Sequence, residues 1–240
     1  MMISKRLETI VSMIEPCGVL ADIGCDHAYV SIRAVQDQKA AHVIAADAAK
    51  GPLETARRNC REAGTEASTE FILSDGFGGI SEESGIECAV IAGMGGILIS
   101  RILQDAKLGR FPELRQLILG PQSDQDLVRK TIQQTGIFQI MRELWVLDEG
   151  KYYVLLDVRK SPEITGQEPW SEAEYFYGKN PDPGTMDVYL DYLSARRRAL
   201  YDAYESSRKG SPEKNYEKTC GLKYRIELVE TAILKAGGRI

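Results

Sequence analysis

Carboxylates and glycines follow the short apolar runs in the first half of the chain. The first run leads into residues 21–29, Ala-Asp-Ile-Gly-Cys-Asp-His-Ala-Tyr, and later runs end at Asp47, at Asp75-Gly76 and at residues 92–96. In an open α/β sheet, ligands bind beyond the carboxyl ends of the strands. If these runs are parallel strands, the sequence predicts a ligand site built from four consecutive strand ends.

The first of these loops indicates what kind of ligand is bound. Gly24 allows a tight turn and a close approach to the backbone, but Asp26 and Tyr29 occupy the second and third glycine positions of the dinucleotide-binding G-x-G-x-x-G pattern. The carboxylates of Asp22 and Asp26 would repel a pyrophosphate and attract an ammonium group. S-adenosylmethionine carries a cationic amine and no phosphate, so the loop favours this cofactor over NAD.

The other strand ends offer groups for the rest of a nucleoside. Asp47 can accept hydrogen bonds from both ribose hydroxyls, Asp75 can accept one from an adenine amino group, and Gly76 adds a backbone amide beside it. The fourth strand end exposes bare backbone to the ligand through Gly93, Met94 and Gly95. A single aspartate after a strand is often only a helix cap, but four such ends in succession indicate a nucleoside-type cofactor site.

The elements that position these loops alternate between strands and helices, as in βαβ units. Strands are predicted at 19–24, 42–47, 68–75, 87–92 and 116–120, with helices at 29–38, 52–63, 96–106 and 124–135. Two further strands, 138–147 and 152–158, flank a tight-turn sequence. The predicted fold class is therefore α/β, a Rossmann-like sheet that is mostly parallel and ends in an antiparallel hairpin.

After residue 160 the pattern changes. A loop rich in Pro, Gly and Asn runs to about residue 184, and two helical segments follow at 186–208 and 212–235. Both segments carry apolar residues at alternating spacings of three and four, which predicts an antiparallel helical hairpin, a short coiled coil. We therefore expect two domains, a cofactor-binding domain over 1–160 and a small α-helical domain over 161–240.

Composition restricts the remaining possibilities. The net charge of -5 does not indicate a nucleic-acid partner, so any RNA contact must come from a local basic patch. Five cysteines without a C-x-x-C pair and only two histidines predict neither disulfides nor a metal site. Glu8 and Glu15 interrupt any apolar N-terminal stretch, and the longest uncharged run, 88–100, is too short to cross a bilayer. We expect a cytoplasmic protein with no membrane partner.

Five strings resemble the bacterial tRNA adenine-22 N1-methyltransferases, the TrmK family. They are Ser4-Lys5-Arg6-Leu7, residues 21–29, Gly51-Pro52-Leu53, Ala92-Gly93-Met94-Gly95-Gly96 and Glu149-Gly150-Lys151-Tyr152-Tyr153. The resemblance implies a class I methyltransferase with a C-terminal coiled coil that methylates N1 of adenine 22 in tRNA. It places Asp22 and Gly24 at the methionine end of the cofactor, Asp47 at its ribose and Asp75 at its adenine.

One departure from the family concerns the target base. The family usually has Leu-Gln-Pro-Asn or a close variant after its fifth strand, whereas this chain has Leu119-Gly120-Pro121-Gln122. Gln122 is then the amide expected near the base, and Gly120 removes a side chain. We further expect Tyr29 to stack on or orient the base, Asp26 to favour the developing cation, and His27 to hydrogen-bond the base or hold the loop.

Contacts to RNA are expected from two basic clusters. The first is Lys5 and Arg6, and the second is Arg196, Arg197 and Arg198. The region from 161 on contains 12 Lys and Arg against 13 Asp and Glu, so solvated helix charges are the alternative interpretation for each arginine. A monomer is expected, with a dimer left open.

Three other functions remain open at this stage. They are a class I methyltransferase that acts on another RNA, a protein or a small molecule; an NAD-dependent oxidoreductase; and a non-catalytic RNA-binding protein that keeps the fold.

Overall fold

The computed structural model describes residues 3–161, 170–208 and 212–240, and only the backbone of residues 212–215. The chain divides into two compact units, Met1–Gln167 and Glu168–Ile240. The first unit contains the sheet and the predicted ligand site, and the second is helical.

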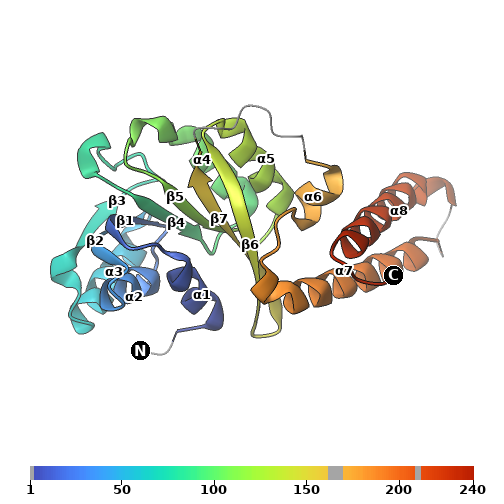
Figure 1. Ribbon diagram of the computed structural model, residues 1–240, viewed down its shortest axis with the longest axis horizontal. Helices are drawn as coiled ribbons and strands as arrows, with labels where there is room; N and C mark the ends of the chain where they lie inside the picture. Colours follow the sequence, from blue (N-terminus) through green and yellow to red (C-terminus); the bar gives the residue numbers. More distant parts are fainter. Residues whose placement is uncertain (1–2, 162–169, 209–211) are drawn as a thin grey trace. The chain divides into compact units, whose positions relative to one another are not determined.

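A seven-stranded sheet forms the centre of the first unit, with the order β3-β2-β1-β4-β5-β7-β6 (Figure 1). The first five strands pair in parallel, and β7 lies antiparallel to both β5 and β6. The strands are β1 (Cys17–Ile23), β2 (Ala40–Asp47), β3 (Thr69–Leu73), β4 (Cys88–Ala92), β5 (Gln116–Gly120), β6 (Phe138–Asp148) and β7 (Lys151–Lys160). The predicted mostly parallel sheet with an antiparallel hairpin is confirmed.

Helices cover both faces of this sheet. Helices α1, α2 and α3 cover one face, and helices α4 and α5 cover the other (Figure 1). Their bounds are α1 (Lys5–Met13), α2 (Tyr29–Gln36), α3 (Lys50–Glu62), α4 (Gly96–Asp105) and α5 (Gln125–Thr135). Four of the five were predicted; α1 was not.

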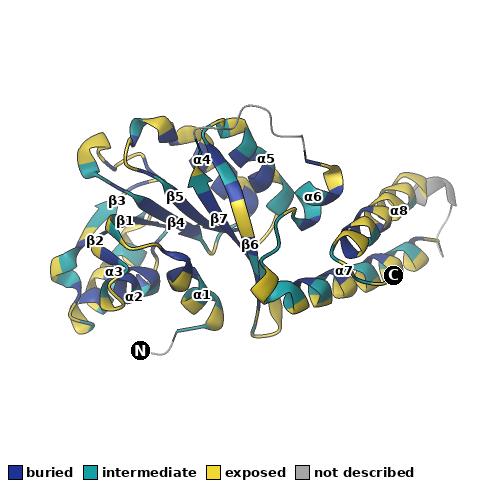
Figure 2. Ribbon diagram, in the orientation of Figure 1, coloured by how far each residue is buried: buried dark blue, intermediate teal, exposed yellow. Residues whose placement is uncertain are grey.

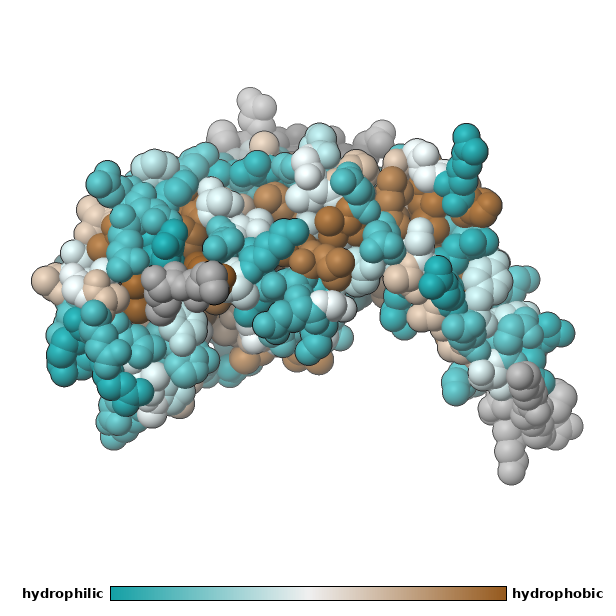
Figure 3. All heavy atoms as spheres, turned by 90° about the horizontal axis from the view of Figure 1, so that it is seen from below, coloured by the Kyte–Doolittle hydropathy of each residue, from teal (hydrophilic) through white to brown (hydrophobic). Residues whose placement is uncertain are grey.

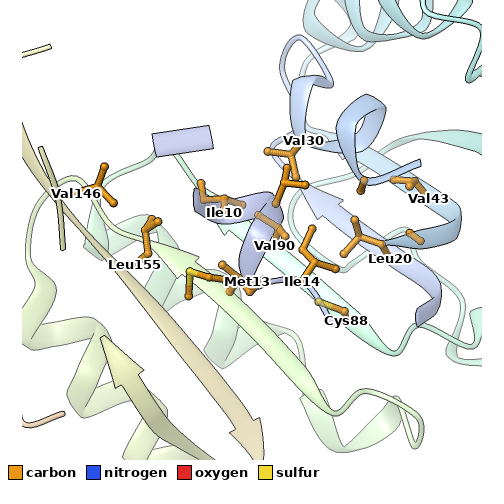
Figure 4. Close-up of a cluster of buried hydrophobic side chains, with 14 residues drawn as sticks. Ile10, Met13, Ile14, Leu20, Val30, Val43, Cys88, Val90, Val146 and Leu155 are labelled. Carbon is orange, nitrogen blue, oxygen red and sulfur yellow. The ribbon is translucent and has the colours of Figure 1, made fainter. Parts of the chain in front are cut away.

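The helix α1 begins after an N-cap residue and buries one face. The Ser4 side chain accepts a hydrogen bond from the Leu7 amide at 3.4 Å, as an N-cap does. Ile10 and Met13, three residues apart on one face, are buried. Figure 4 shows them packed with residues of the sheet and of α2, including Val30, Val90 and Leu155. This packing fixes α1 against the first unit.

The central strands are buried along most of their length (Figure 2). Such continuous apolar runs are typical of parallel strands covered on both faces. Figure 3 shows one face of the molecule, where hydrophilic residues predominate and hydrophobic ones gather in patches between them. Among the described residues, no helix is long and apolar enough to span a membrane.

The second unit consists of α6 (Glu172–Tyr177), α7 (Met186–Arg208) and α8 (Pro212–Lys235). The predicted helices 186–208 and 212–235 are present and pack along each other, and α6 packs on α8. Five residues of the predicted apolar stripes are buried, namely Leu193, Leu200, Ile226, Val229 and Ile233. The helical C-terminal part is confirmed, and its description as a coiled coil stays a prediction.

The helix α6 lies where a loop was expected. Ser171 and Glu174 form a reciprocal capping box at its start, and Ala173 and Tyr177 are buried. The Ser-x-x-Glu spacing is a known signal for a helix start, and it stands in the sequence at 171–174. The loop was predicted from the Pro, Gly and Asn content of the segment alone, and the capping signal was not used.

Candidate cofactor and substrate site

The loops after β1 and β2 are joined by backbone hydrogen bonds. The amides of Gly24 and Cys25 donate to the Ala46 carbonyl at 2.8 and 3.0 Å. The Asp26 amide donates to Oδ2 of Asp47 at 3.3 Å. The structure thus brings the predicted acidic loop and the predicted ribose-binding carboxylate together.

The loops after β4 and β5 continue the same edge. A Cβ atom on Gly24 would lie 2.6 Å from Cε of Met94, so these two loops are in contact, and the φ angle of 74° at Gly24 would strain any other residue there. The Gln122 amide donates to the Met94 carbonyl at 3.0 Å, and the Gly93 amide donates to the Gly120 carbonyl at 3.2 Å. Strand ends β1, β2, β4 and β5 therefore form one continuous surface.

Gly120, where this chain departs from the family string, is closely surrounded by Ala92 and Leu155. A Cβ atom there would lie 2.9 Å from Cβ of Ala92 and 3.2 Å from Cδ2 of Leu155. The Gln122 side chain is exposed beyond β5. The geometry leaves Gln122 free to reach a substrate, which is its expected role.

Asp22 is a buried carboxylate without a cationic partner among the residues that the structure describes. It is 5 % exposed, and the Ser31 hydroxyl donates to its Oδ2 at 2.6 Å. Burial raises the pKa of Asp22 to about 6, against the lowering effect of the Ser31 hydrogen bond, and the charge of Asp47 adds to the rise. A ligand ammonium group would supply the missing positive charge.

We expect the affinity for S-adenosylmethionine to increase as the pH rises through about 6, because the Asp22 carboxylate then ionises. The ligand amine stays charged up to roughly pH 7.7. The free energy of unfolding should change in the opposite direction. The Asp22 pKa of about 6 in the fold exceeds its ordinary value of 3.8, so unfolding releases a proton between these values and stability falls as pH rises.

Calorimetric titrations at pH 5, 6 and 7, with denaturation curves at the same pH values, test this prediction. Asp22→Asn should flatten both profiles. Ser31→Ala should shift them to higher pH, since it removes a hydrogen bond that lowers the Asp22 pKa. A wild-type affinity independent of pH across this window would contradict the role of Asp22.

The two carboxylates expected at the nucleoside are held differently. Oδ1 of Asp47 accepts a hydrogen bond from the Ala49 amide at 2.9 Å, which orients the side chain at the end of β2. Asp75 forms a bidentate ion pair with Arg101 of α4, with N···O distances of 2.9 and 3.0 Å. Nothing in the sequence indicated Arg101, which lies 26 residues further on.

The candidate catalytic loop has an unusual backbone. Asp26 and Ala28 have φ angles of 46° and 58°, which is uncommon for residues other than Gly, Asn and Asp and therefore unusual for Ala28. Rings of His27 and Tyr29 stack with their centroids 5.4 Å apart. The exposed Asp26 carboxylate lies 3.6 Å from Nε2 of His27. The loop thus presents an aromatic pair and a carboxylate side by side, at the edge where the strands end.

The three arginines of α7 do not act as one cluster. Arg197 is paired with Glu230 at 2.8 Å and lies over the Tyr201 ring. Arg198 is exposed, while Arg196 is half-buried. Because successive helix residues point in different directions, the three side chains do not share one face, and Arg198 is the most exposed of them.

The other basic pair lies at the start of α1. Lys5 is exposed, and Arg6 is half-buried against the Tyr153 ring. Among the described residues, no group of three or more His, Cys, Asp or Glu side chains could hold a metal ion.

The residues at this edge fit S-adenosylmethionine. A bare turn at Gly24, a buried carboxylate at Asp22 and an oriented carboxylate at Asp47 suit an amine and a ribose, and they disfavour a pyrophosphate. The part of the chain that the structure describes offers no cation to Asp22. Together with the strand order, they define a class I methyltransferase. In agreement, the sequence model of a family described as methyltransferase domain matches residues 3–156.

Comparisons with individual proteins narrow this class. The tRNA (adenine(22)-N(1))-methyltransferase of Bacillus subtilis is 28% identical over 233 residues, which cover 96% of this chain and 97% of that protein. The crystal structure of the B. subtilis M1A22 tRNA methyltransferase TrmK has a TM-score of 0.81 and 28% identity, covering 97% of this chain and 99% of that one.

A streptococcal structure extends the comparison to the cofactor. Streptococcus pneumoniae Sp1610, provisionally assigned as a tRNA (m1A22) methyltransferase, is 30% identical with a TM-score of 0.81, covering 96% of this chain and 99% of that one. Sp1610 has also been solved in complex with S-adenosyl-L-methionine. The chain belongs to this TrmK family of tRNA (m1A22) methyltransferases within the methyltransferase domain family.

Proposed function

We propose that this protein transfers a methyl group from S-adenosylmethionine to N1 of adenine 22 in tRNA. The observation that carries the proposal is the likeness over nearly the whole chain to proteins with that named activity. The acidic strand ends of the first unit support it, because they suit the cofactor amine and ribose. Residues 1–160 then form the catalytic domain, and residues 161–240 form a helical domain that contacts tRNA.

Methyl transfer to adenine N1 does not require the protein to transfer a proton. When bound, the cofactor supplies an electrophilic methyl group on a sulfonium. Adenine N1 carries a lone pair at neutral pH, so no general base is needed, and the base becomes positively charged as it reacts. The residues of the site must hold the base in line and favour that charge. The Asp26 carboxylate can do the latter, because it is exposed at the loop beside Tyr29.

The target adenine must leave its stack before it reacts, because N1 lies on the Watson–Crick edge. The stacked rings of His27 and Tyr29 offer an aromatic surface to receive it. The exposed side-chain amide of Gln122 can hydrogen-bond an edge of the base. Lys5, Arg6 and Arg198 are the proposed phosphate contacts, and the cytoplasm is the proposed location, where tRNA is found.

Transfer of labelled methyl to unmodified bacterial tRNA tests the proposal, with adenine 22 present and with guanine in its place. Label that disappears with the substitution supports both the reaction and the site. Label that persists would support methyltransferase activity but would show that another nucleotide is methylated. No label on any tRNA, while the cofactor binds, would favour a protein or small-molecule substrate.

We expect Tyr29→Ala to lower kcat about tenfold or more, since stacking on an aromatic ring is worth ~1–3 kcal/mol per base. Tyr29→Phe keeps the ring, so it should retain most of the activity if stacking is the role of Tyr29. Asp26→Ala should lower kcat by removing the carboxylate that favours the cation. Single-turnover rates with saturating cofactor measure these effects. Full activity of both Tyr29→Ala and Asp26→Ala would show that this loop does not serve the base.

A further inference from the structure

Arg6 lies beside the loop that follows β4. A Cβ atom on Gly93 would lie 3.8 Å from Nη1 of Arg6. The guanidinium carbon is 5.1 Å from the centroid of the Tyr153 ring, over its face. Tyr153 stands near the start of β7, which is antiparallel to β5, so it belongs to the same edge of the sheet as the carboxyl end of β4. Segments far apart in the sequence thus meet next to Gly93.

The backbone of Arg6 is fixed independently of its side chain. The Arg6 amide donates to Oδ2 of Asp148 at 3.1 Å. This hydrogen bond, with a further one from the Ser4 side chain, lowers the pKa of Asp148 below its usual range. Asp148 therefore holds the first turn of α1 in place by accepting hydrogen bonds from the amides of that turn. The charge of Arg6 also lowers the pKa of Asp148, but the guanidinium forms no direct ion pair with it.

No carboxylate lies within ion-pair distance of the Arg6 guanidinium, as far as the described residues show. Other arginines of the first unit, such as Arg101 and Arg115, are paired with aspartate or glutamate. The Arg6 guanidinium makes a cation–π contact with the Tyr153 ring, and its N–H groups donate no hydrogen bond among the described residues. Their fork matches the oxygens of a phosphate.

We propose that Arg6, held on Tyr153, binds a phosphate that flanks the target adenosine and so positions the base at Gly93. This inference rests on the proposed function. Met94 touches Gly24 of the cofactor loop, whereas its neighbour Gly93 faces Arg6. The Arg6 guanidinium and the cofactor loop therefore contact adjacent residues of the loop after β4. A base taken out of its stack is held through its backbone as well as its edge, and phosphate contacts fix its register.

The decisive experiment removes the charge of Arg6 in one arm and the charge of a phosphate next to adenosine 22 in the other. Full-length wild-type protein and Arg6→Gln are assayed on tRNA with natural phosphates and on tRNA with a methylphosphonate 5′ or 3′ of adenosine 22. Wild type should lose roughly 10- to 100-fold in kcat/KM on one methylphosphonate substrate, the size of one charge-assisted contact. Arg6→Gln should show a similar loss on natural tRNA and little further loss on that modified tRNA.

Matched variants separate this role from general effects of charge and folding. Arg58→Gln removes an exposed guanidinium group from α3, where no contact with tRNA is proposed, and should change kcat/KM less than about threefold, as expected for one peripheral charge. Tyr153→Phe should behave like wild type, whereas Tyr153→Leu should weaken tRNA recognition by removing the ring beneath Arg6. The cofactor dissociation constant should stay unchanged in all of them, which shows that the fold and the cofactor site persist.

Two results would overturn the inference while leaving the function intact. One is losses that multiply between Arg6→Gln and the methylphosphonates, which would make the two groups independent. The other is an Arg6→Gln variant as active as wild type. If wild-type protein does not methylate adenine 22 in natural tRNA, the proposed function itself fails, and that outcome is visible before any variant is compared.

Discussion

Asp47→Ala should weaken the binding of S-adenosylmethionine by about 100-fold or more, the largest effect expected at the cofactor site. The carboxylate at the end of β2 is the proposed acceptor for two ribose hydroxyls, and a hydrogen bond to a charged group is worth ~1.5–3 kcal/mol. The same carboxylate accepts the Asp26 and Ala49 amides. Its removal therefore also loosens the loop that carries Asp26. Isothermal titration with the cofactor in the absence of tRNA measures the loss directly.

Two controls make this result specific. Asp47→Asn keeps the shape and one acceptor oxygen, so its affinity should fall between those of wild type and Asp47→Ala. Asp105→Ala removes the same charge from an exposed position at the end of α4 and should leave the affinity unchanged. An Asp47→Ala variant that binds the cofactor as wild type does would place the ribose elsewhere.

Asp47 could be located from the sequence because its position depends on a regular element. A buried parallel strand is a continuous apolar run, and its carboxyl end lies at the ligand-binding edge of the sheet. The same reasoning located Asp22, Gly24 and the glycines after β4. What the strand pattern does not contain is the partner of each side chain.

Partners that come from distant elements were missed for this reason. Arg101 on Asp75 and Ser31 on Asp22 both come from helices packed on the sheet, and no spacing rule connects them. The positive φ angles at Asp26 and Ala28 were not predicted either, and the Asp26 amide there bonds to Asp47, 21 residues away. The aromatic pair of His27 and Tyr29 follows from that backbone.

Strand order is a second feature that the sequence left open. The hairpin of β6 and β7 was predicted, but the insertion of β7 between β5 and β6 was not. That insertion brings Tyr153 to the edge that carries Gly93, where Arg6 lies against it. The position of Arg6 also depends on α1, a helix that was not predicted. The sequence indicated Arg6 as an RNA contact, but its place beside Gly93 and Tyr153 comes from the tertiary structure.

Arg129→Met should destabilise the protein by about 3–5 kcal/mol, because it removes the guanidinium group that pairs with the buried Glu143 carboxylate. Arg129 of α5 and Glu143 of β6 are both fully buried and form an ion pair, with Nε and Nη2 of the arginine at 2.9 and 2.6 Å from Oε2 of the glutamate. Equilibrium denaturation of the full chain measures the cost. For a unit of this size, the melting temperature should fall by roughly 6–20 °C.

The double variant Arg129→Met with Glu143→Leu distinguishes a lost ion pair from lost packing. It replaces both charges by apolar side chains of similar volume, so it should recover most of the stability, and such replacements are often neutral or stabilising. If the double variant is no more stable than the single one, the cost lies in shape and contacts at the α5–β6 packing, and the charge of Glu143 is not what makes Arg129 necessary.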